Sequence, residues 1–582
     1  MSSSPGPRRR SPDGFVRPAS PRHEAWEPRR LVQPAREVAA GDAVLAGEPT
    51  NPATPDLSAA SAARLGGRAI ALAGVVVVAG VVLSRFLGWI RLSVFFAEYG
   101  ASSDLDAFLA AFRIPDTLFQ LVAAGAVGSA LVPVASALLA NGEERRARRL
   151  VATIANLMML ALIPLAVVVW LAAPAIVPVI APSPDQAKVS LEIGLTRWML
   201  ISPIFLALGA AMTAGLNAAG IFGAPALAPN VYNLAIIASA VVLTPVLGIY
   251  GLAIGVVLGA VGLAGVQSFA VRKNGLYGLV LDVHDPAVRE TLLLMAPRAL
   301  GLGATQIVFL VNTYFALQLG NGPLGIYTGA FTALQVPVGL IGVPLGIVLL
   351  PPLSQAIARG DKERFSRLVD QSLRLVLYAV IPLMGLMLAL ATPTLAFLYQ
   401  HGEFTQADIS TMVPVFAVFL LGLVAHVLIS LLAPIFYSGK DTRTPVAAAL
   451  LAVAVDVLAA IILFPLFQLG GLALAIGLGA WAEVTTLLYF MRHRIGFDIR
   501  PLGLTVAFAI PGATLATAGT LAMDRGIAGL THGSSAFLVL AFELGLAGLA
   551  GLAVYLAWSR LLRLPELSEA LALARTVLRR AG

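Results

Sequence analysis

The sequence contains no cysteine, and only 12% of its 582 residues are charged. The absence of cysteine excludes disulfides and thiolate metal sites, and it leaves the redox compartment open. Soluble domains average about 25% charged residues, so this chain is poor in charge. With 58% apolar residues and a mean hydropathy of +0.87, it is predicted to be an all-α polytopic membrane protein.

Catalytic motifs are missing as well. The sequence has no Walker-type phosphate loop and no HExxH or GxSxG motif. We therefore expect no enzyme, no catalytic residues, no bound metal and no cofactor. Without a nucleotide site, the energy for any transport has to come from an ion gradient or from the gradient of the substrate itself.

Positive charge is in excess, with a formal net charge of +8 and a pI of about 9.9. The basic residues are concentrated in short loops and at the two ends of the chain. This distribution fits the anionic cytoplasmic face of a membrane better than a nucleic-acid groove. We expect membrane lipids as partners, and no nucleic acid.

Residues 1–66 differ in composition from the rest of the chain, being rich in Pro, Ser, Ala and Arg and free of any long apolar run. They are predicted to form a disordered, basic cytoplasmic tail. A cleavable signal peptide would need an apolar segment directly after the early charges, and none follows. The tail is either simply solvated or docks on anionic lipid or on a partner protein.

About fourteen stretches are long enough to cross roughly 30 Å of hydrocarbon. Their approximate limits are 69–90, 105–138, 150–174, 191–216, 226–246, 251–271, 290–317, 324–356, 367–392, 408–437, 445–467, 470–491, 501–522 and 536–560. The second and the eighth are long and are interrupted by Pro or Gly. Basic residues cluster in alternate loops, which by the positive-inside rule predicts an even number of spans with both termini in the cytoplasm.

The chain also resembles itself at a spacing of about 218–220 residues. Gly128, Pro133 and Arg149 recur as Gly346, Pro351 and Arg367, and the segments 251–253 and 259–260 recur as 471–473 and 479–480. An even number of spans separates the copies, so both halves have the same orientation. We expect two six-helix lobes related by a pseudo-twofold axis along the membrane normal, with a transport site between them.

This duplication defines the expected domains. Residues 67–280 would form the first lobe, residues 281–495 the second, and residues 496–565 two further helices, followed by a cytoplasmic tail at 566–582.

Several charges lie within or next to apolar stretches where a membrane helix tolerates them poorly. Arg85 and Arg91 follow a run of valines, and Asp104, Asp106 and Arg113 occupy the next span. A lone guanidinium near the bilayer centre costs roughly 2.5–3.5 kcal/mol on insertion scales. Such charges persist mainly where they face a water-filled cavity, so the sequence indicates a transporter with a cationic interior and an anionic cargo.

The first hairpin and several later segments carry recognisable motifs. They are 84–91 (SRFLGWIR), 106–108 (DAF), 111–115 (AFRIP), 125–126 (GA), 132–133 (VP), Gly342 with 350–354 (LPPLS), 402–405 (GEFT), 433–438 (APIFYS) and 444–445 (TP). Together they resemble the MurJ (MviN) lipid II flippases of the multidrug/oligosaccharidyl-lipid/polysaccharide exporter superfamily, over about residues 69–560. The resemblance implies two six-helix lobes facing a central cavity and two extra helices that form a lipid-accessible groove.

By this resemblance Arg85, Arg91 and Asp106 line or gate the cavity, and Arg113 occupies a position that is basic in the family. Arginine suits a pyrophosphate because its planar guanidinium binds phosphate oxygens bidentately and stays charged. Arg91 and Asp106 are expected to form an outer-gate salt bridge. A helix-start cap is the alternative role for Asp106, and Asp104 competes for either role.

The chain departs from the family pattern at other cavity positions. Charged family positions are occupied here by Leu92, Phe119, Gln120, Ala124, Phe331, Thr332 and Gln335. Arg298, at the start of the seventh predicted span, could oppose Arg85 and replace a missing arginine of the eighth span. These departures bear on the identity of the substrate more than on the fold.

Asp456 lies in the middle of its predicted span. A carboxylate there is protonated, paired or bound to a cation. The resemblance makes Asp456 the candidate cation ligand of the second lobe and leaves Na⁺, H⁺ or the membrane potential open as the coupling energy.

The leading interpretation is a monomeric flippase in the bacterial plasma membrane. It would move lipid II, the undecaprenyl-pyrophosphate-linked peptidoglycan precursor, from the cytoplasmic to the outer leaflet by alternating access. One alternative is an exporter of another polyprenyl-linked oligosaccharide or of a small drug. The other is a transport-inactive scaffold for cell-wall synthesis proteins.

Overall fold

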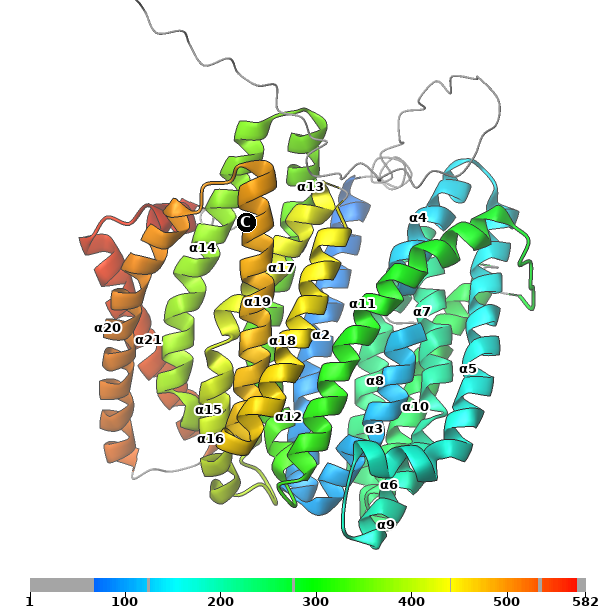
Figure 1. Ribbon diagram of the computed structural model, residues 1–582, viewed down its shortest axis with the longest axis horizontal. Coiled ribbons are helices and arrows are strands. Elements are labelled where there is room, and N and C mark those ends of the chain that lie inside the picture. The colour runs from blue at the N-terminus through cyan, green and yellow to red at the C-terminus, as the bar shows by residue number, and fades with distance from the viewer. Residues whose placement is uncertain (1–66, 123–125, 275–277, 440, 532–535, 573–582) are drawn as a thin grey trace, which may run out of the picture.

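The structure, a computed structural model, describes residues 67–122, 126–274, 278–439, 441–531 and 536–572. The predicted tail at 1–66 lies outside this range, as does the end of the C-terminal tail from residue 573. All regular elements of the described residues are helices (Figure 1). The predicted all-helical class is therefore confirmed.

The helices of the first half, in chain order, are α2 (Gly67–Tyr99), α3 (Ser103–Val122), α4 (Ala126–Ala140), α5 (Glu144–Ile180), α6 (Gln186–Met199), α7 (Ser202–Ala218), α8 (Gly223–Val242), α9 (Thr244–Leu247) and α10 (Tyr250–Lys273). Those of the second half are α11 (Pro286–Leu317), α12 (Pro323–Pro337), the π-helix η2 (Val338–Gly342), α13 (Val343–Ala358), α14 (Lys362–Ala389), α15 (Ala391–Tyr399), α16 (Gln406–Leu420), α17 (Leu423–Ser438), α18 (Arg443–Phe467) and α19 (Leu469–Ile495). The chain ends with α20 (Arg500–Thr531), α21 (Phe537–Leu561) and a short helical segment over 565–572.

Within the described residues, twelve helices are long and apolar enough to cross a membrane, and the bent pair α16–α17 brings the number to thirteen. The remaining predicted span lies in α11, of which only Leu302–Leu317 is counted, as a shorter apolar helix. The first half of α11 carries Arg289, Glu290 and Arg298, which interrupt its apolar character.

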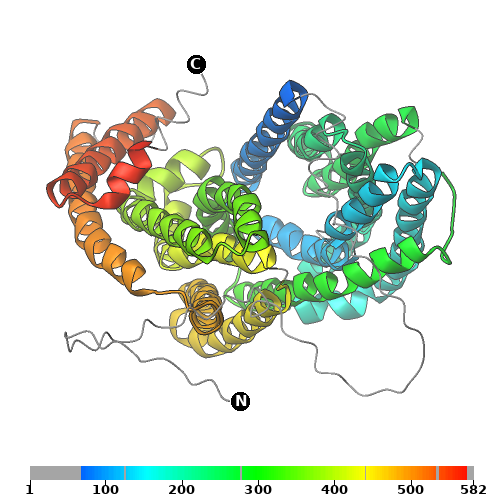
Figure 2. The same cartoon turned by 90° about the horizontal axis from the view of Figure 1, so that it is seen from above.

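The helices form two bundles when the molecule is viewed from above (Figure 2). The first bundle is defined here as α3–α10 and the second bundle as α12–α21. Helix α2 packs on α8 of the first bundle and on α15 and α12 of the second, while α11 packs on α3, α4 and α5 and on α18 and α12. Two long helices therefore connect the bundles.

The internal duplication is visible in the packing of equivalent helix pairs. A Cβ atom at Gly259 of α10 would lie 2.8 Å from the Tyr232 carbonyl oxygen of α8, and one at Gly479 of α19 would lie 2.8 Å from the Ala452 carbonyl oxygen of α18. Both the glycines and their neighbours are separated by the same 220-residue register that the sequence shows. Glycine lets the backbones of each pair approach closely, as small residues do in membrane bundles.

The eighth predicted span contains a π-helical segment, since it comprises α12, η2 and α13. The second predicted span comprises α3 and α4, which lie on either side of residues outside the described range. A π-helical turn leaves the regular hydrogen-bond ladder of an α-helix and is frequent at functional sites. Here it lies opposite Arg85, as described below.

The two bundles meet at the end where α2 finishes and α3 begins, which the positive-inside pattern assigns to the outer side. Phe96 of α2 is fully buried and lies 5.0 Å from Tyr399 and 4.5 Å from Phe404, measured between ring centroids. The main hydrophobic core includes residues of α2, α3 and the second bundle, whereas a separate core fills α4, α5, α7 and the start of α11. The bundles are thus joined at this end, which is called the outer end below after that prediction.

Candidate functional site

The outer closure brings backbone segments from distant parts of the chain together. The Glu403 amide donates to the Ala97 carbonyl oxygen at 2.9 Å. Gly402, Gly100 and Gly322 each lie so close to a facing backbone that a Cβ atom would clash with it, and all three have positive φ. Glycine is required here because other residues rarely adopt positive φ and would not fit the gap.

Asp106 is fully buried in this closure, and its partners differ from the expected one. Its two carboxylate oxygens accept from the backbone amides of Gly322 at 2.7 Å and Gly325 at 2.8 Å. The predicted gate salt bridge with Arg91 is therefore not formed in this conformation. The carboxylate binds the N-terminal end of α12 instead, where unpaired amides and the helix dipole favour an anion.

Two residues that the sequence did not single out accompany Asp106. Lys188 of α6 donates from Nζ to Asn321 Oδ1 at 3.3 Å, which links the first bundle to the loop before α12. Glu192, one helical turn further, is fully buried, and neither of its carboxylate oxygens has a hydrogen-bond partner. A Lys and a Glu four residues apart at the start of a predicted span are the sequence signal that could have pointed to this cluster.

Arg91 and Arg113 lie on the inner side of this closure, each next to an aromatic ring. The Arg91 guanidinium lies 6.0 Å from the ring centroid of Tyr232, and that of Arg113 lies 5.1 Å from the ring centroid of Phe309. Arg113 Nε is buried without a hydrogen-bond partner. Asp116, which the sequence analysis missed, is electrostatically attracted to both arginines.

Arg85 is exposed and lies further along α2 toward the inner side. A Cβ atom on Gly339 of η2 would lie 3.8 Å from Arg85 Nε. The guanidinium therefore reaches from α2 to the π-helical turn of the eighth span. The side chain of Arg298 lies outside the described residues, although its backbone is part of α11, so its pairing with Arg85 stays a prediction.

Asp456 lies in the second bundle among other buried polar groups. It is 5% exposed, and its Oδ1 atom has no hydrogen-bond partner. Tyr327 of α12 interacts electrostatically with Asp456 and lies next to Asn312 of α11. The Tyr327 hydroxyl and both amide atoms of Asn312 are also buried without partners.

Carboxylate, amide and hydroxyl oxygens are ligands of hard cations, and Asp456 Oδ1, the Tyr327 hydroxyl and the Asn312 amide oxygen have no hydrogen-bond partner that would compete for them. The described residues contain no cluster of three or more His, Cys, Asp or Glu that could hold a metal ion. A monovalent ion bound by one carboxylate and neutral oxygens fits these residues better than a divalent one.

Comparison with known proteins agrees with this geometry. The family profile described as "Lipid II flippase MurJ" matches residues 96–541. "Lipid II flippase MurJ" of Burkholderia cenocepacia is 32% identical over 448 residues, which cover 75% of this chain and 87% of that protein. "Probable lipid II flippase MurJ" of Vibrio cholerae is 30% identical over 518 residues, which cover 85% and 97%.

Solved structures share the fold. A structure titled "Lipid II flippase MurJ, inward closed conformation" superposes with a TM-score of 0.69 at 22% identity, covering 84% of this chain and 98% of that one. An inward-facing transporter of the multidrug resistance MATE family, from the MOP superfamily, gives a TM-score of 0.58 at 15% identity, covering 72% and 94%.

Proposed function

Because the chain belongs to the MurJ family of lipid II flippases, and is thus a multi-pass membrane transporter and not an enzyme, we propose that it moves lipid II from the cytoplasmic to the outer leaflet by alternating access. The observation that carries the proposal is the placement of Arg85, Arg91 and Arg113 between two bundles that are joined at the outer end. Guanidinium groups held there can bind the pyrophosphate of the substrate bidentately.

In this proposal, the membrane orientation follows from the basic residues of the loops. Both termini lie in the cytoplasm of the bacterial plasma membrane, because basic residues are enriched in the loops on that side. The start of α2 and the end of α21 lie on the same side of the molecule (Figure 1), as an even number of spans requires.

In this proposal, the two lobes move relative to each other and the other segments are accessory. Residues 67–280 and 281–495 act as the two lobes, and residues 496–565 form the groove that accepts the polyprenyl chain. The tails are 1–66 and 566–582. The protein works as a monomer, and any contact with cell-wall synthesis proteins is made through the tails.

In the proposed cycle, Arg85 at the η2 turn meets the head group first, and Arg91 and Arg113 hold it deeper in the cavity. Asp106 keeps the outer end closed through its bonds to α12. Outward opening requires that Asp106 release the Gly322 and Gly325 amides, which leaves it free to meet Arg91 in the open state.

The transport assay is complementation of cells depleted of their lipid II flippase. Residues 67–582 should restore growth. Arg85→Ala should abolish this rescue, because the guanidinium that binds the pyrophosphate is lost, and a lipid II accessibility assay should then show no outward movement. Arg148→Ala, at an exposed arginine that forms an ion pair with Glu144, is the matched control and should behave as wild type. Growth that Arg85→Ala leaves intact would contradict the proposed role of the cavity arginines.

A cation at Asp456 would supply coupling energy, and Asp456, Tyr327 and Asn312 would hold it. With Asp456→Asn, we expect transport in vesicles to lose its dependence on an imposed Na⁺ or H⁺ gradient and to fall roughly tenfold or more. Glu403→Gln, an exposed carboxylate at the outer end, should keep the dependence. A wild-type rate that responds to neither gradient, only to the membrane potential, would remove the cation site from the mechanism.

Export of another polyprenyl-linked oligosaccharide or of a small drug is a second candidate, favoured by one feature of α12. Phe331 occupies a family position that is usually charged, and it packs 5.8 Å from Phe309 and 5.6 Å from Phe419, centroid to centroid. Failed complementation with export of a different glycan would support this candidate. Rescue of growth would also eliminate the transport-inactive scaffold.

A further inference from the structure

Asp116 lies on α3, three residues after Arg113, so the two side chains occupy neighbouring positions on one helix face. Gln120, one turn further, donates from Nε2 to Asp116 Oδ1 at 3.5 Å, a long hydrogen bond. The carboxylate is attracted to Arg113 and, across the gap between helices, to Arg91 of α2. It also acts electrostatically on Tyr232 of α8, the ring beside Arg91.

The carboxylate is a neighbour of Arg113 on the same helix face, and it forms no ion pair with either arginine. Among the residues that the structure describes, no ion pair within 4.0 Å joins Asp116 to Arg113 or Arg91. Arg113 Nε has no hydrogen-bond partner at all. The guanidinium donors therefore remain available to a ligand, while a negative charge nearby offsets part of the cost of holding two cations in a poorly solvated place.

We propose that Asp116 is an internal counter-anion. It sets the net charge of the arginine site to match that of a pyrophosphate diester, so that the head group can dissociate quickly. This inference rests on the proposed function and adds a specificity-determining residue to it. Asp116 is a positioning and charge-setting group, since it repels the phosphate and does not bind it.

The charges support this role. Arg85, Arg91 and Arg113 carry three positive charges, and Asp116 reduces them to a net of two among the described side chains. A pyrophosphate that links two groups carries two ionised oxygens, so the site and its ligand neutralise each other. Without the carboxylate the site would hold an excess positive charge and would bind the anion too tightly for fast release on the other side.

The test compares Asp116→Asn with wild type, using the purified full chain in lipid nanodiscs and lipid II as the probe. Because a unit charge a few ångströms from a partly buried phosphate changes affinity by roughly tenfold, the variant should bind lipid II about tenfold more tightly. Its maximal transport rate in vesicles should fall severalfold, since release becomes slow. A merely structural role would weaken binding and transport together.

Two further variants isolate the charge. Asp116→Glu keeps the carboxylate and should bind lipid II as wild type does. Asp104→Asn, the same substitution at an exposed position of α3, should change neither quantity. If Asp116→Asn loses its cooperative thermal transition, Asp116→Ser makes the same change of charge with a smaller side chain.

Two outcomes overturn the inference in distinguishable ways. If wild type binds lipid II and both neutral variants bind it equally or more weakly, Asp116 is not a counter-anion, and the proposed function stands. If wild type shows no affinity for lipid II, the proposed function fails and the inference fails with it.

Discussion

Asp106 binds the N-terminal end of a helix that lies more than 200 residues further along the chain. It is fully buried between α3 and α12, yet both of its oxygens are satisfied by the amides of Gly322 and Gly325. A carboxylate in this position neutralises the positive end of the α12 dipole. Because the acceptor belongs to α3 and the donors to α12, the proposed opening of the outer end would break both bonds.

Asp106→Asn should therefore favour the open outer end. An amide keeps one acceptor but loses the charge, which would destabilise the closed state by roughly 1–2 kcal/mol. The chain has no cysteine, so spin labels can be placed cleanly at Ser190→Cys and Ser410→Cys, which are exposed at the outer ends of the two bundles. Double electron–electron resonance should show a longer distance between the two labels in the variant than in the otherwise wild-type protein. Unchanged distances, with Asp104→Asn as control, would refute the gating role.

The paired helices α8–α10 and α18–α19 each depend on a glycine, because a side chain at that position would not fit between the helices. Gly259 and Gly479 have no side chain at the point where each pair crosses, and their backbone neighbours Tyr232 and Ala452 occupy the space. The other neighbours differ, since Ile236 faces Gly259 and Asp456 faces Gly479. The two pairs thus share the same close packing, while only the second pair has a buried carboxylate at this position.

Alanine at either glycine should separate the helices. A Cβ atom 2.8 Å from a backbone oxygen forces a shift that costs roughly 1–3 kcal/mol. The melting temperature of the purified protein in detergent should fall for Gly259→Ala and Gly479→Ala. Gly265→Ala in α10 and Gly470→Ala in α19 have no atom closer than 4.0 Å, so they should be neutral or slightly stabilising through helix propensity. Equal melting temperatures for all four would contradict this packing.

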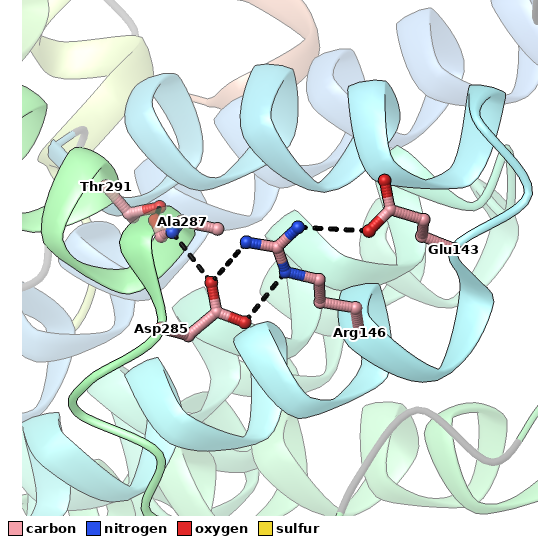
Figure 3. A network of polar contacts seen from close by, with 5 residues as sticks. All are labelled: Glu143, Arg146, Asp285, Ala287 and Thr291. Atoms are coloured by element: carbon pink, nitrogen blue, oxygen red, sulfur yellow. Dashed lines mark hydrogen bonds and ion pairs between the residues drawn. The ribbon is translucent and has the colours of Figure 1, made fainter.

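At the scale of the whole molecule, the connection between the two halves is fastened to the first bundle. Arg146 of α5 binds Asp285 through two hydrogen bonds, of 2.9 Å and 2.8 Å, and also binds Glu143 (Figure 3). Asp285 in turn caps α11 by accepting from the Ala287 amide at 2.8 Å. Asn156 donates to the carbonyl oxygens of Gly278 and Val280 in the same connection. The start of α11 is therefore held against α5.

This fastening should depend on pH. The Arg146 guanidinium lowers the pKa of Asp285 below its ordinary value of 3.8. A group with a lowered pKa stabilises the fold fully above its unfolded pKa, and this contribution is lost as the pH falls through the folded pKa. The difference in melting temperature between wild type and Asp285→Asn should be constant at neutral pH and shrink below about pH 4. Arg146→Gln should abolish this pH dependence, and a difference that grows in acid would contradict the assignment.

The sequence alone determined the features that depend on neighbouring residues. Apolar runs of about 20 residues predict spanning helices, and the repeat of Gly259 at Gly479 predicts a duplicated pair, because hydropathy and small-residue spacing are local properties. Arg85, Arg91 and Arg113 stood out for the same reason, as charges beside apolar residues.

Only the tertiary structure decided which groups meet. Asp106 was expected to pair with Arg91, but its partners Gly322 and Gly325 lie 216 and 219 residues further along the chain. Asp116 and Arg113 are neighbours on α3, but the interaction of Asp116 with Arg91 exists only because α2 packs against α3. Such partners follow from the crossing of distant helices, and no local pattern of charge or hydropathy encodes where two helices cross.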